Sequence, residues 1–352
     1  YPLRRQRQMC IRDRYTIAEK QQMFPHLFNS LSVVIPVLSS TFASVGRFLK
    51  HAGNMSLGML IIDESGQAVP QSALGAIYRT RRAVVVGDPL QVEPVVTIPK
   101  VLIDILADST CVANEYKVIE NSAQTFADNI NEFNGMIGER QVGCPLVVHR
   151  RCIEPMFSIS NLISYDNRMF NKTNKKEEYL KPENPFLIKK SGWINVEGVE
   201  NGGKDHFVKN QAERVCQLME DAVHIYSDLF ETDDKIFIIT PFRTVAESMR
   251  KFIISYFSAK GYDKEILSKW TKNCVGTVHT FQGKDANEVL LVLGCSNKSA
   301  GAMNWVVKKA NILNVACTRA KYRIAFIGNI NDWKNRRYFR EFIPNLIDII
   351  NV

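Results

Sequence analysis

The sequence predicts an α/β fold in which parallel sheets are covered by helices on both faces. Short apolar runs rich in β-branched residues recur along the 352 residues, and helical patterns separate several of them. Strands buried on both faces have this near-continuous apolar character, and helices between successive strands are typical of parallel sheets. Ligands bind such sheets at the carboxyl ends of the strands, so functional residues are expected there.

Seven apolar runs, each ending in a polar or glycine-containing turn, are the expected strands. They are SVVIPVLSST (32–41), GMLIIDESG (58–66), RAVVVGDPL (82–90), KIFIITPF (235–242), NCVGTVHTF (273–281), EVLLVLGC (288–295) and YRIAFIGN (322–329). The expected helices cover 71–78, 212–230, 245–257 and 306–317. The segment 171–205 is rich in Lys, Asn and Pro and is expected to be an exposed excursion, interrupted by a strand at 193–196.

Composition limits the class of protein. A hydrophobic content of 45% in 352 residues supplies the cores of two domains. The eight cysteines form no C-x-x-C pair and have no histidine at ligand spacing, so the sequence predicts reduced thiols and no zinc site. No apolar run is long enough to span a membrane. We therefore expect a cytoplasmic protein without a membrane partner.

The positive charge is concentrated at the beginning of the chain. Of the net +9, residues 1–14 contribute +4 through five arginines and one aspartate. This opening has no apolar periodicity and resembles the read-through of a sequencing adapter, so we expect it to be an artefact or a disordered segment. The remaining +5 favours a nucleic-acid partner only weakly.

Two strand ends carry residues suited to nucleotide chemistry. In LIIDESGQ (60–67), Asp63 has the ligand type that Mg²⁺ prefers, and Glu64 can orient and deprotonate a water molecule. In VVVGDPLQ (84–91), a turn with Gly87 and Asp88 precedes Gln91, whose amide can contact a terminal phosphate and an attacking water together. For an isolated Asp-Glu pair, a solvated acidic turn is the favoured interpretation.

Taken together, these two stretches resemble motifs II (DEA-x-Q) and III (GDP-x-Q-x-x-P) of superfamily 1 helicases of the Upf-like branch, with Ser65 in place of the usual alanine. Further stretches resemble the family's other motifs in the same order. They are PVLSSTFAS (36–44), HRRC (149–152, similar to QYRM), IITPFRTVAESMR (238–250), VGTVHTFQGKDANEVLLV (275–292, similar to motif V) and NILNVACTRAKYRIAFIG (311–328, similar to motif VI). In motif V, His279 replaces an acid and Asp285 replaces the family's glutamate.

The resemblance implies a P-loop NTPase-type fold with two RecA-like motor domains, the first of them truncated. We expect the first domain at 15–142 and the second at 143–352. The implied activity is an ATP-dependent helicase or translocase that uses ATP and Mg²⁺ and moves on single-stranded nucleic acid, with DNA favoured over RNA. The branch further implies 5′-to-3′ movement.

The resemblance also assigns site residues. Those expected to act in catalysis are Asp63, which also holds Mg²⁺, Glu64, Gln91, Arg151 and Arg319, the two arginines as fingers on the γ-phosphate. Those expected to bind the nucleotide are Gly87, Asp88, Gln282, Gly283 and Asp285. Those expected to contact the strand are Thr41, Ser44, Thr277, His279 and Thr318. Surface ion pairs are the alternative for the arginines. Phe242, Phe281 and Trp305 can stack on bases, but core packing is favoured for each.

One stretch imitates a phosphate-binding loop. GVENGGKD (198–205) matches the spacing G-x-x-x-x-G-K but ends in Asp205, where a carboxylate would repel phosphate. In the helicase family the true loop precedes motif II by well over a hundred residues, so we expect an ordinary turn here and no ATP turnover by the 352 residues alone. Two alternatives stay open: a non-catalytic nucleic-acid-binding or assembly module, and a helicase domain that serves a fused nuclease.

Overall fold

The computed structural model describes residues 15–113, 116–117, 121–137, 140–173, 185–200, 205–281 and 283–350. Within these residues the chain forms two compact units. The first unit comprises the chain up to Pro89 together with Glu93–Asn134, and the second comprises Leu90–Val92 and the chain from Gly135 onward. The expected division of the motor domains at 142/143 stays a prediction. No helix among the described residues is long and apolar enough to cross a membrane.

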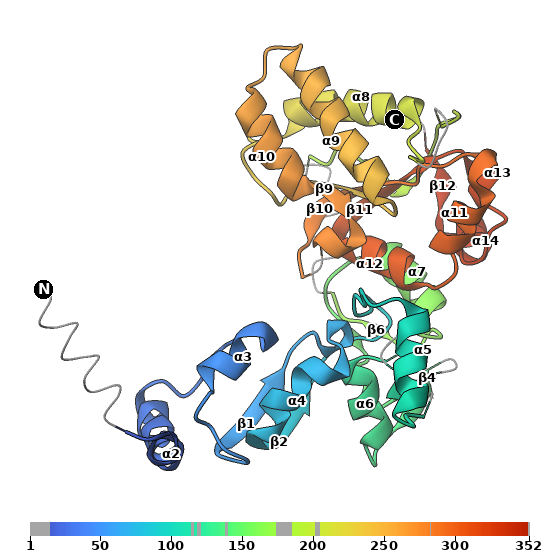
Figure 1. Ribbon diagram of the computed structural model, residues 1–352. Coiled ribbons are helices and arrows are strands. Elements are labelled where there is room, and N and C mark those ends of the chain that lie inside the picture. The colour runs from blue at the N-terminus through green and yellow to red at the C-terminus, as the bar shows by residue number, and fades with distance from the viewer. Residues whose placement is uncertain are drawn as a thin grey trace, which may run out of the picture. The chain divides into compact units, whose positions relative to one another are not determined.

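The first unit is built around two parallel strands, β1 (Leu57–Ile62) and β2 (Thr80–Val85). Its helices are α2 (Ile17–Val34), α3 (Phe42–Phe48), α4 (Pro70–Tyr78), α5 (Lys100–Ser109) and α6 (Ala123–Ile130), with a 3-10 turn η1 at Ser65–Gln67 (Figure 1). Helix α4 connects β1 to β2, which is the strand–helix–strand order expected for a parallel pair. Apolar side chains on the pair, among them Met59 and Ile61, are more than half exposed.

The strand expected at 32–41 is wrong. Residues 32–34 complete α2, which begins after a capping box between Thr16 and Glu19, and no strand is found between α2 and α3. Val33 and Val37 are 84% and 81% exposed, so this apolar run lacks the burial that would make it a strand. Pro36 also removes a backbone donor from the run, which disfavours a place inside a sheet.

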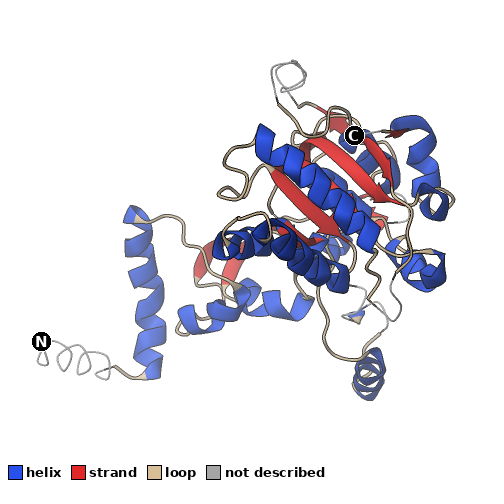
Figure 2. Ribbon diagram, turned by 90° about the horizontal axis from the view of Figure 1, so that it is seen from above, coloured by secondary structure: helices blue, strands red, loops and turns tan. Residues whose placement is uncertain are grey.

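The second unit contains a six-stranded sheet in which every neighbouring pair is parallel. The strand order is β12-β7-β11-β10-β8-β9. The strands are β7 (Gly192–Asn195), β8 (Ile236–Thr240), β9 (Val275–Thr277), β10 (Ala286–Val292), β11 (Ala320–Gly328) and β12 (Asp348–Ile349). Figure 2 shows them side by side with helices over the sheet. The prediction of an α/β fold on parallel sheets is confirmed.

Helices pack in two groups against this sheet. Helices α8 (Lys209–Ile225), α9 (Arg243–Ser258) and α10 (Lys264–Cys274) contact one another, while α7 (Met156–Ser164) packs with α12 (Asn311–Arg319) and α14 (Phe339–Leu346) (Figure 1). Small elements complete the unit: β3 (Gly135–Ile137), β4 (Arg140–Val142), β5 (Val148–His149), β6 (Phe170–Asn171), η3 (Val278–Phe281), η4 (Asn297–Ser299), α11 (Ala300–Val306) and α13 (Ile330–Trp333). One continuous hydrophobic core joins the sheet to both groups.

Two other expectations need correction. The helix expected at 306–317 begins later, as α12 at Asn311; the lysine-containing segment 307–310 separates it from α11, which ends at Val306. The segment 171–205 is only partly an exposed excursion. Leu187 and Ile188 are buried, and their backbone N–H groups donate to the carboxylate of Glu288 at 2.9 and 2.7 Å, which draws this part of the chain into the core.

Candidate functional site

In the first unit, the turns after β1 and β2 lie against each other. The backbone N–H of Ser65 donates to the carbonyl of Val86 at 3.0 Å, and the N–H of Val86 donates to the carbonyl of Ile62 at 2.8 Å. A Cβ added to Gly87 would lie 2.6 Å from Ser65 Oγ and 2.7 Å from the backbone nitrogens of Ser65 and Gly66. Only glycine fits at position 87, so the Asp-Glu turn and the Gly-Asp-Pro turn form one compact edge.

The buried Ser65 hydroxyl holds this edge in place. Its Oγ lies 2.9 Å from the Val86 carbonyl and 2.6 Å from Oε1 of Gln124. Gln124 in turn donates from Nε2 to Asp128 at 2.8 Å, so α6 is fastened beneath the turn. An alanine, which the helicase family usually has here, would leave the Gln124 oxygen without this donor. The departure from the family pattern therefore has a structural role.

The two carboxylates of the turn are exposed. The N–H of Glu64 donates to Asp63 Oδ1 at 2.9 Å, and Gln67 donates from Nε2 to Glu64 Oε2 at 3.0 Å. Glu64 has φ of 54°, in the left-handed region that residues other than glycine adopt rarely and that recurs at functional sites. Exposed carboxylate oxygens at a strand end are the donor set that Mg²⁺ prefers, so the residues present fit this cofactor.

Thr41 and Ser44 lie at the start of α3 in the same unit. The Thr41 hydroxyl donates to Ser44 Oγ at 3.2 Å, and the N–H of Ser44 donates to the Thr41 carbonyl at 2.9 Å. Thr41 is exposed and Ser44 is half-buried. Their contact with a strand stays a prediction.

The segment that contains Gln91 belongs to the second unit, although Gly87 and Asp88 belong to the first. Leu90 accepts a hydrogen bond at its carbonyl from Asn314 Nδ2 at 2.9 Å, and Val92 is buried in the core of the second unit. Gln91 is therefore held between two anchored neighbours. The motif III stretch passes from one compact unit to the other within these few residues.

Asn314 is the centre of this anchoring. The side chain is fully buried on α12, its Oδ1 accepts from Ser160 Oγ at 2.5 Å, and its Nδ2 also donates to the Tyr165 hydroxyl at 3.0 Å. These partners satisfy the buried amide, which would otherwise cost about 1–3 kcal/mol for each unsatisfied group. The motif VI helix is thus bonded to the backbone next to Gln91.

Motifs V and VI meet at a second point in the same unit. Arg319 is 1% exposed, and its Nη1 donates to the carbonyls of Phe281 and Lys284 at 3.3 and 3.0 Å. Asp285 forms an ion pair with Lys321 at 2.7 Å. Ala286 and Ala320 face each other in the parallel β10–β11 pairing. The predicted finger Arg319 therefore reaches the motif V backbone in this structure, and the predicted nucleotide ligand Asp285 has a lysine partner.

The other candidate residues of motifs V and VI differ in their burial and hydrogen bonding. Thr318 is buried and its hydroxyl donates to the Asn314 carbonyl at 2.9 Å. Thr277 is half-buried at the end of β9, and Gly283 has φ of +73°, which favours glycine. His279 is exposed, and desolvation of part of its ring lowers the pKa, which favours the neutral imidazole. Gln282 lies outside the described residues.

The HRRC segment presents Arg151 to solvent. The Cys152 N–H donates to His149 Nε2 at 2.9 Å, and the Ile153 N–H donates to the carbonyl of Lys321 at 3.1 Å. Burial, and secondarily the charge of Arg151, lowers the pKa of His149, which suits an imidazole that accepts a hydrogen bond. The loop is therefore fixed on both sides of Arg151, which is itself exposed.

The three aromatic residues considered for stacking on bases differ in how much of each side chain is exposed. Phe242 and Phe281 are 8% and 0% exposed, so core packing is their role. Trp305 is 52% exposed, and its ring centroid lies 5.9 Å from that of Phe242. The expectation of core packing is wrong for Trp305, whose side chain has a solvent-facing surface.

Comparison with known protein families identifies the class. A family described as AAA domain matches residues 132–331, and a second family of the same description matches residues 3–98. The chain belongs to the AAA domain family. The second match begins at residue 3, inside the stretch 1–14 that is expected to be an artefact or disordered. Residues 1–14 lie outside the described part of the structure.

The curated relatives are helicases. The chain is 22% identical over 328 residues to "Probable helicase senataxin" of Mus musculus, covering 90% of this chain and 11% of the relative. It is 24% identical to "Uncharacterized ATP-dependent helicase MJ0104" of Methanocaldococcus jannaschii, covering 81% and 38%. It is 23% identical to "ATP-dependent helicase upf1" of Schizosaccharomyces pombe, covering 81% and 28%. These matches confirm the resemblance to the Upf-like branch of superfamily 1.

The chain spans only a fraction of the length of these relatives, from 11% of senataxin to 38% of the archaeal helicase. Among solved structures, an Arterivirus nonstructural protein 10 helicase in complex with DNA aligns over 79% of this chain and 41% of its own, at a TM-score of 0.36 and 12% identity. A likeness at that level carries no argument about function.

The resemblance to motif VI aligned Asn314 and Lys321 with the family's motif residues but assigned neither of them a role. Gln124 and Asp128 lie in no motif, and only the fold brings them under Ser65.

Proposed function

We propose that this chain is part of an ATP-dependent nucleic-acid helicase, in which ATP hydrolysis drives movement along a single strand. The observation that supports this most strongly is the hydrogen bond from Asn314 to the carbonyl of Leu90. It joins the motif VI helix, which carries Arg319, to the residue before Gln91. Gln91, which would sense the terminal phosphate, is thereby coupled to α12, and Arg319 at the end of α12 donates hydrogen bonds to the motif V backbone.

On the nucleotide side, Asp63 would hold Mg²⁺, and Glu64 would orient and deprotonate the attacking water. When bound, the metal supplies charge neutralisation on the phosphates. The exposed position of both carboxylates and the support of Glu64 by Gln67 favour these roles. Gly87, Asp88, Gly283, Asp285 and Gln282 remain the proposed nucleotide contacts.

Arg151 is the stronger candidate for a finger on the γ-phosphate, because its flanking residues are fixed while it is itself exposed. An arginine so placed offsets the charge that develops on the departing phosphoryl group and is worth about 10³–10⁵ in rate. Arg319 is proposed to act on the same reaction. Its bonds to the carbonyls of residues 281 and 284 favour a positioning role for the motif V turn.

The strand partner is proposed to be single-stranded nucleic acid, with DNA favoured over RNA. The proposed contacts are Thr41 and Ser44 in the first unit and Thr277, His279 and Thr318 in the second. A neutral imidazole at position 279 would contribute hydrogen bonding and ring contact without a charge.

The test is ATP hydrolysis by the protein as its gene encodes it, measured without strand and with single-stranded DNA or RNA. We expect hydrolysis that a strand stimulates, and a loss of at least about 10³-fold in Arg151→Ala. Arg150→Ala is the matched control, since Arg150 is an exposed neighbour. Strand binding without any hydrolysis would contradict the proposal and identify a non-catalytic nucleic-acid-binding module.

A further inference from the structure

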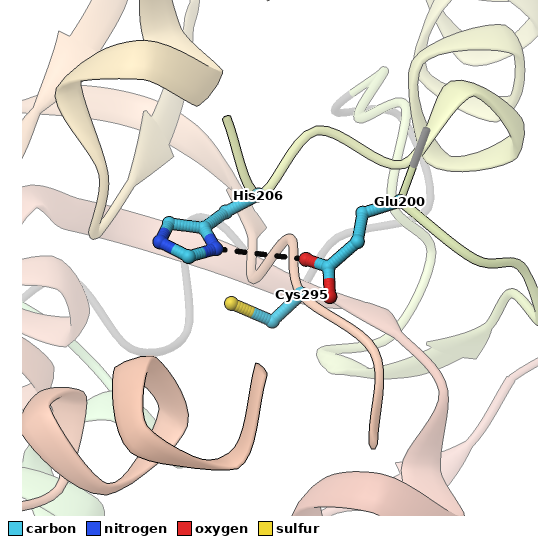
Figure 3. A group of neighbouring side chains, drawn as sticks. All are labelled: Glu200, His206 and Cys295. Atoms are coloured by element: carbon cyan, nitrogen blue, oxygen red, sulfur yellow. Dashed lines mark ion pairs between the residues drawn. The ribbon is translucent and has the colours of Figure 1, made fainter. Parts of the chain in front are cut away.

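A cluster of Glu200, His206 and Cys295 lies at the carboxyl end of the six-stranded sheet, and none of its three residues is among the predicted site residues. Glu200 lies in the loop after β7, His206 precedes α8, and Cys295 follows β10. One potential ligand atom from each residue lies within 4.8 Å of the others, and Figure 3 shows the three side chains converging.

Two polar atoms in this cluster are buried without a hydrogen-bond partner among the described residues: Glu200 Oε2 and His206 Nδ1. They face each other at 3.5 Å, and Glu200 is only 6% exposed. The other Glu200 oxygen accepts from Ser296 Oγ at 3.1 Å. A buried carboxylate oxygen without a donor is costly, and a cation between these atoms would satisfy both of them.

The backbone is shaped to bring the three residues together. The Cys295 N–H donates to the His206 carbonyl at 2.9 Å, and both residues have φ of 56°, in the left-handed region. Gly294 has φ of +62°, and a Cβ there would lie 2.8 Å from the His206 carbonyl oxygen. The close approach of the two segments therefore requires glycine at position 294.

We propose that Glu200, His206 and Cys295 bind a zinc ion. Sulfur, imidazole nitrogen and carboxylate oxygen together are a typical donor set for Zn²⁺, whereas Mg²⁺ and Ca²⁺ prefer oxygen alone. At bond lengths of 2.0–2.3 Å around a tetrahedral centre, ligand atoms lie about 3.3–3.7 Å apart, so side-chain adjustments of about 1 Å close the site. Three protein ligands leave the fourth position to water.

Binding exchanges a proton for the metal. Burial, and secondarily the charge of Glu200, raises the pKa of Cys295 to about 12, against an opposing effect of Arg336. The thiol is therefore protonated at neutral pH when no cation is present. Zinc binding forms the Zn–S bond to the thiolate and releases the thiol proton to solvent, without any change of oxidation state.

A metal here would join Glu200, within the stretch GVENGGKD (198–205), and His206, directly after it, to Cys295 beyond the end of β10. The stretch would then carry a zinc ligand rather than bind phosphate. The His206 ring lies 4.9 Å from that of Phe242, which contacts Trp305. Trp305 is therefore one ring removed from His206, so a cation bound at the site can quench its fluorescence.

The test uses the full chain, stripped of metal by a chelator and titrated with Zn²⁺ and, as a spectroscopic probe, with Co²⁺. We expect one metal per chain, a thiolate-to-cobalt charge-transfer band, and quenching of Trp305 fluorescence by Co²⁺. Cys295→Ala should abolish the band and weaken binding by about 100-fold or more, and Glu200→Gln should weaken it as well. Cys216→Ala, which removes another buried thiol, is the matched control and should bind as the unmodified chain does.

A second pair of variants removes no ligand. Gly294→Ala should lower the zinc affinity, because the added methyl group pushes the His206 carbonyl away, whereas Gly301→Ala, which has open space around it, should not. Two results would overturn the proposal: no stoichiometric metal in a chain that is folded by circular dichroism, or equal affinity in the Cys295→Ala and unmodified chains. The latter would indicate an adventitious surface ion only.

Discussion

Substituting Gly87 by alanine tests whether the two strand-end turns of the first unit act as one edge. The new methyl carbon would lie 2.6–2.7 Å from three atoms of Ser65 and Gly66, two of them backbone nitrogens. Favourable contact begins at about 3.5 Å, so the turns would have to separate by about 0.8 Å. Overpacking of this kind costs about 1–3 kcal/mol. The Ser65 N–H to Val86 carbonyl bond should weaken first.

Amide hydrogen exchange is the assay, because it reports local opening of the β1–β2 edge. A cost of 1–3 kcal/mol corresponds to about 5–150-fold faster exchange at the amides of Ser65 and Val86 in Gly87→Ala. Adding Ser65→Ala should not rescue protection, since the two backbone contacts remain. Gly58→Ala is the matched control on β1, where a Cβ meets nothing within 4 Å. Unchanged protection at both amides in Gly87→Ala would refute the reasoning.

Three further predictions concern the second unit. Asn314→Ala removes the hydrogen bonds to the Leu90 carbonyl and to the Ser160 and Tyr165 hydroxyls, so it should lower the free energy of unfolding by about 2–4 kcal/mol in urea titrations. A loss below about 0.5 kcal/mol would contradict the anchoring role. The Asp285–Lys321 ion pair is about one-third exposed, so a double-mutant cycle should give a coupling energy of only about 0.5–1 kcal/mol that falls as the salt concentration rises. Zero coupling would mean that the ion pair does not contribute to stability. Burial raises the folded-state pKa of Glu288 above its unfolded value, so the folded state binds more protons and the contribution of Glu288 to stability falls as pH rises from the unfolded towards the folded pKa. Glu288→Gln should therefore flatten that part of the curve of unfolding free energy against pH. An unchanged slope would contradict this role of Glu288.

The sheet was predictable because apolar content and strand burial coincide in the second unit. In the strands containing Ile238, Leu290 and Phe326 most residues are buried, as the apolar composition of these runs indicates. The run at 32–41 is also rich in β-branched residues, although it contains Pro36; its first three residues end a capped helix, and the whole run stays exposed. Local sequence cannot show whether a neighbouring strand exists to receive such a run, so tertiary context decides.

The position of a candidate residue could be predicted where it depends on local sequence, but not where it depends on assembly of the fold. The apolar run before Asp63 and Glu64 predicted that they follow a strand, and β1 ends at Ile62, directly before them. The sequence did not show that Arg319 is buried against backbone carbonyls, because the motif V and VI stretches come together only in the folded sheet, where β10 and β11 are neighbours. The same holds for Cys295, which reaches Glu200 and His206 only across the sheet edge. No spacing rule for cysteine and histidine captures that arrangement.

The most direct test of the proposed function is Glu64→Gln in the protein as its gene encodes it, with ATP affinity and the strand-stimulated hydrolysis rate measured on the same preparation. The amide is nearly isosteric, so contacts that hold the nucleotide should survive while the base is lost. We predict an ATP dissociation constant within about 3-fold of the unmodified protein and a rate lower by about 10²–10⁴-fold. A loss of affinity as large as the loss of rate, or an unchanged rate, would contradict the assignment of Glu64 as the residue that activates water.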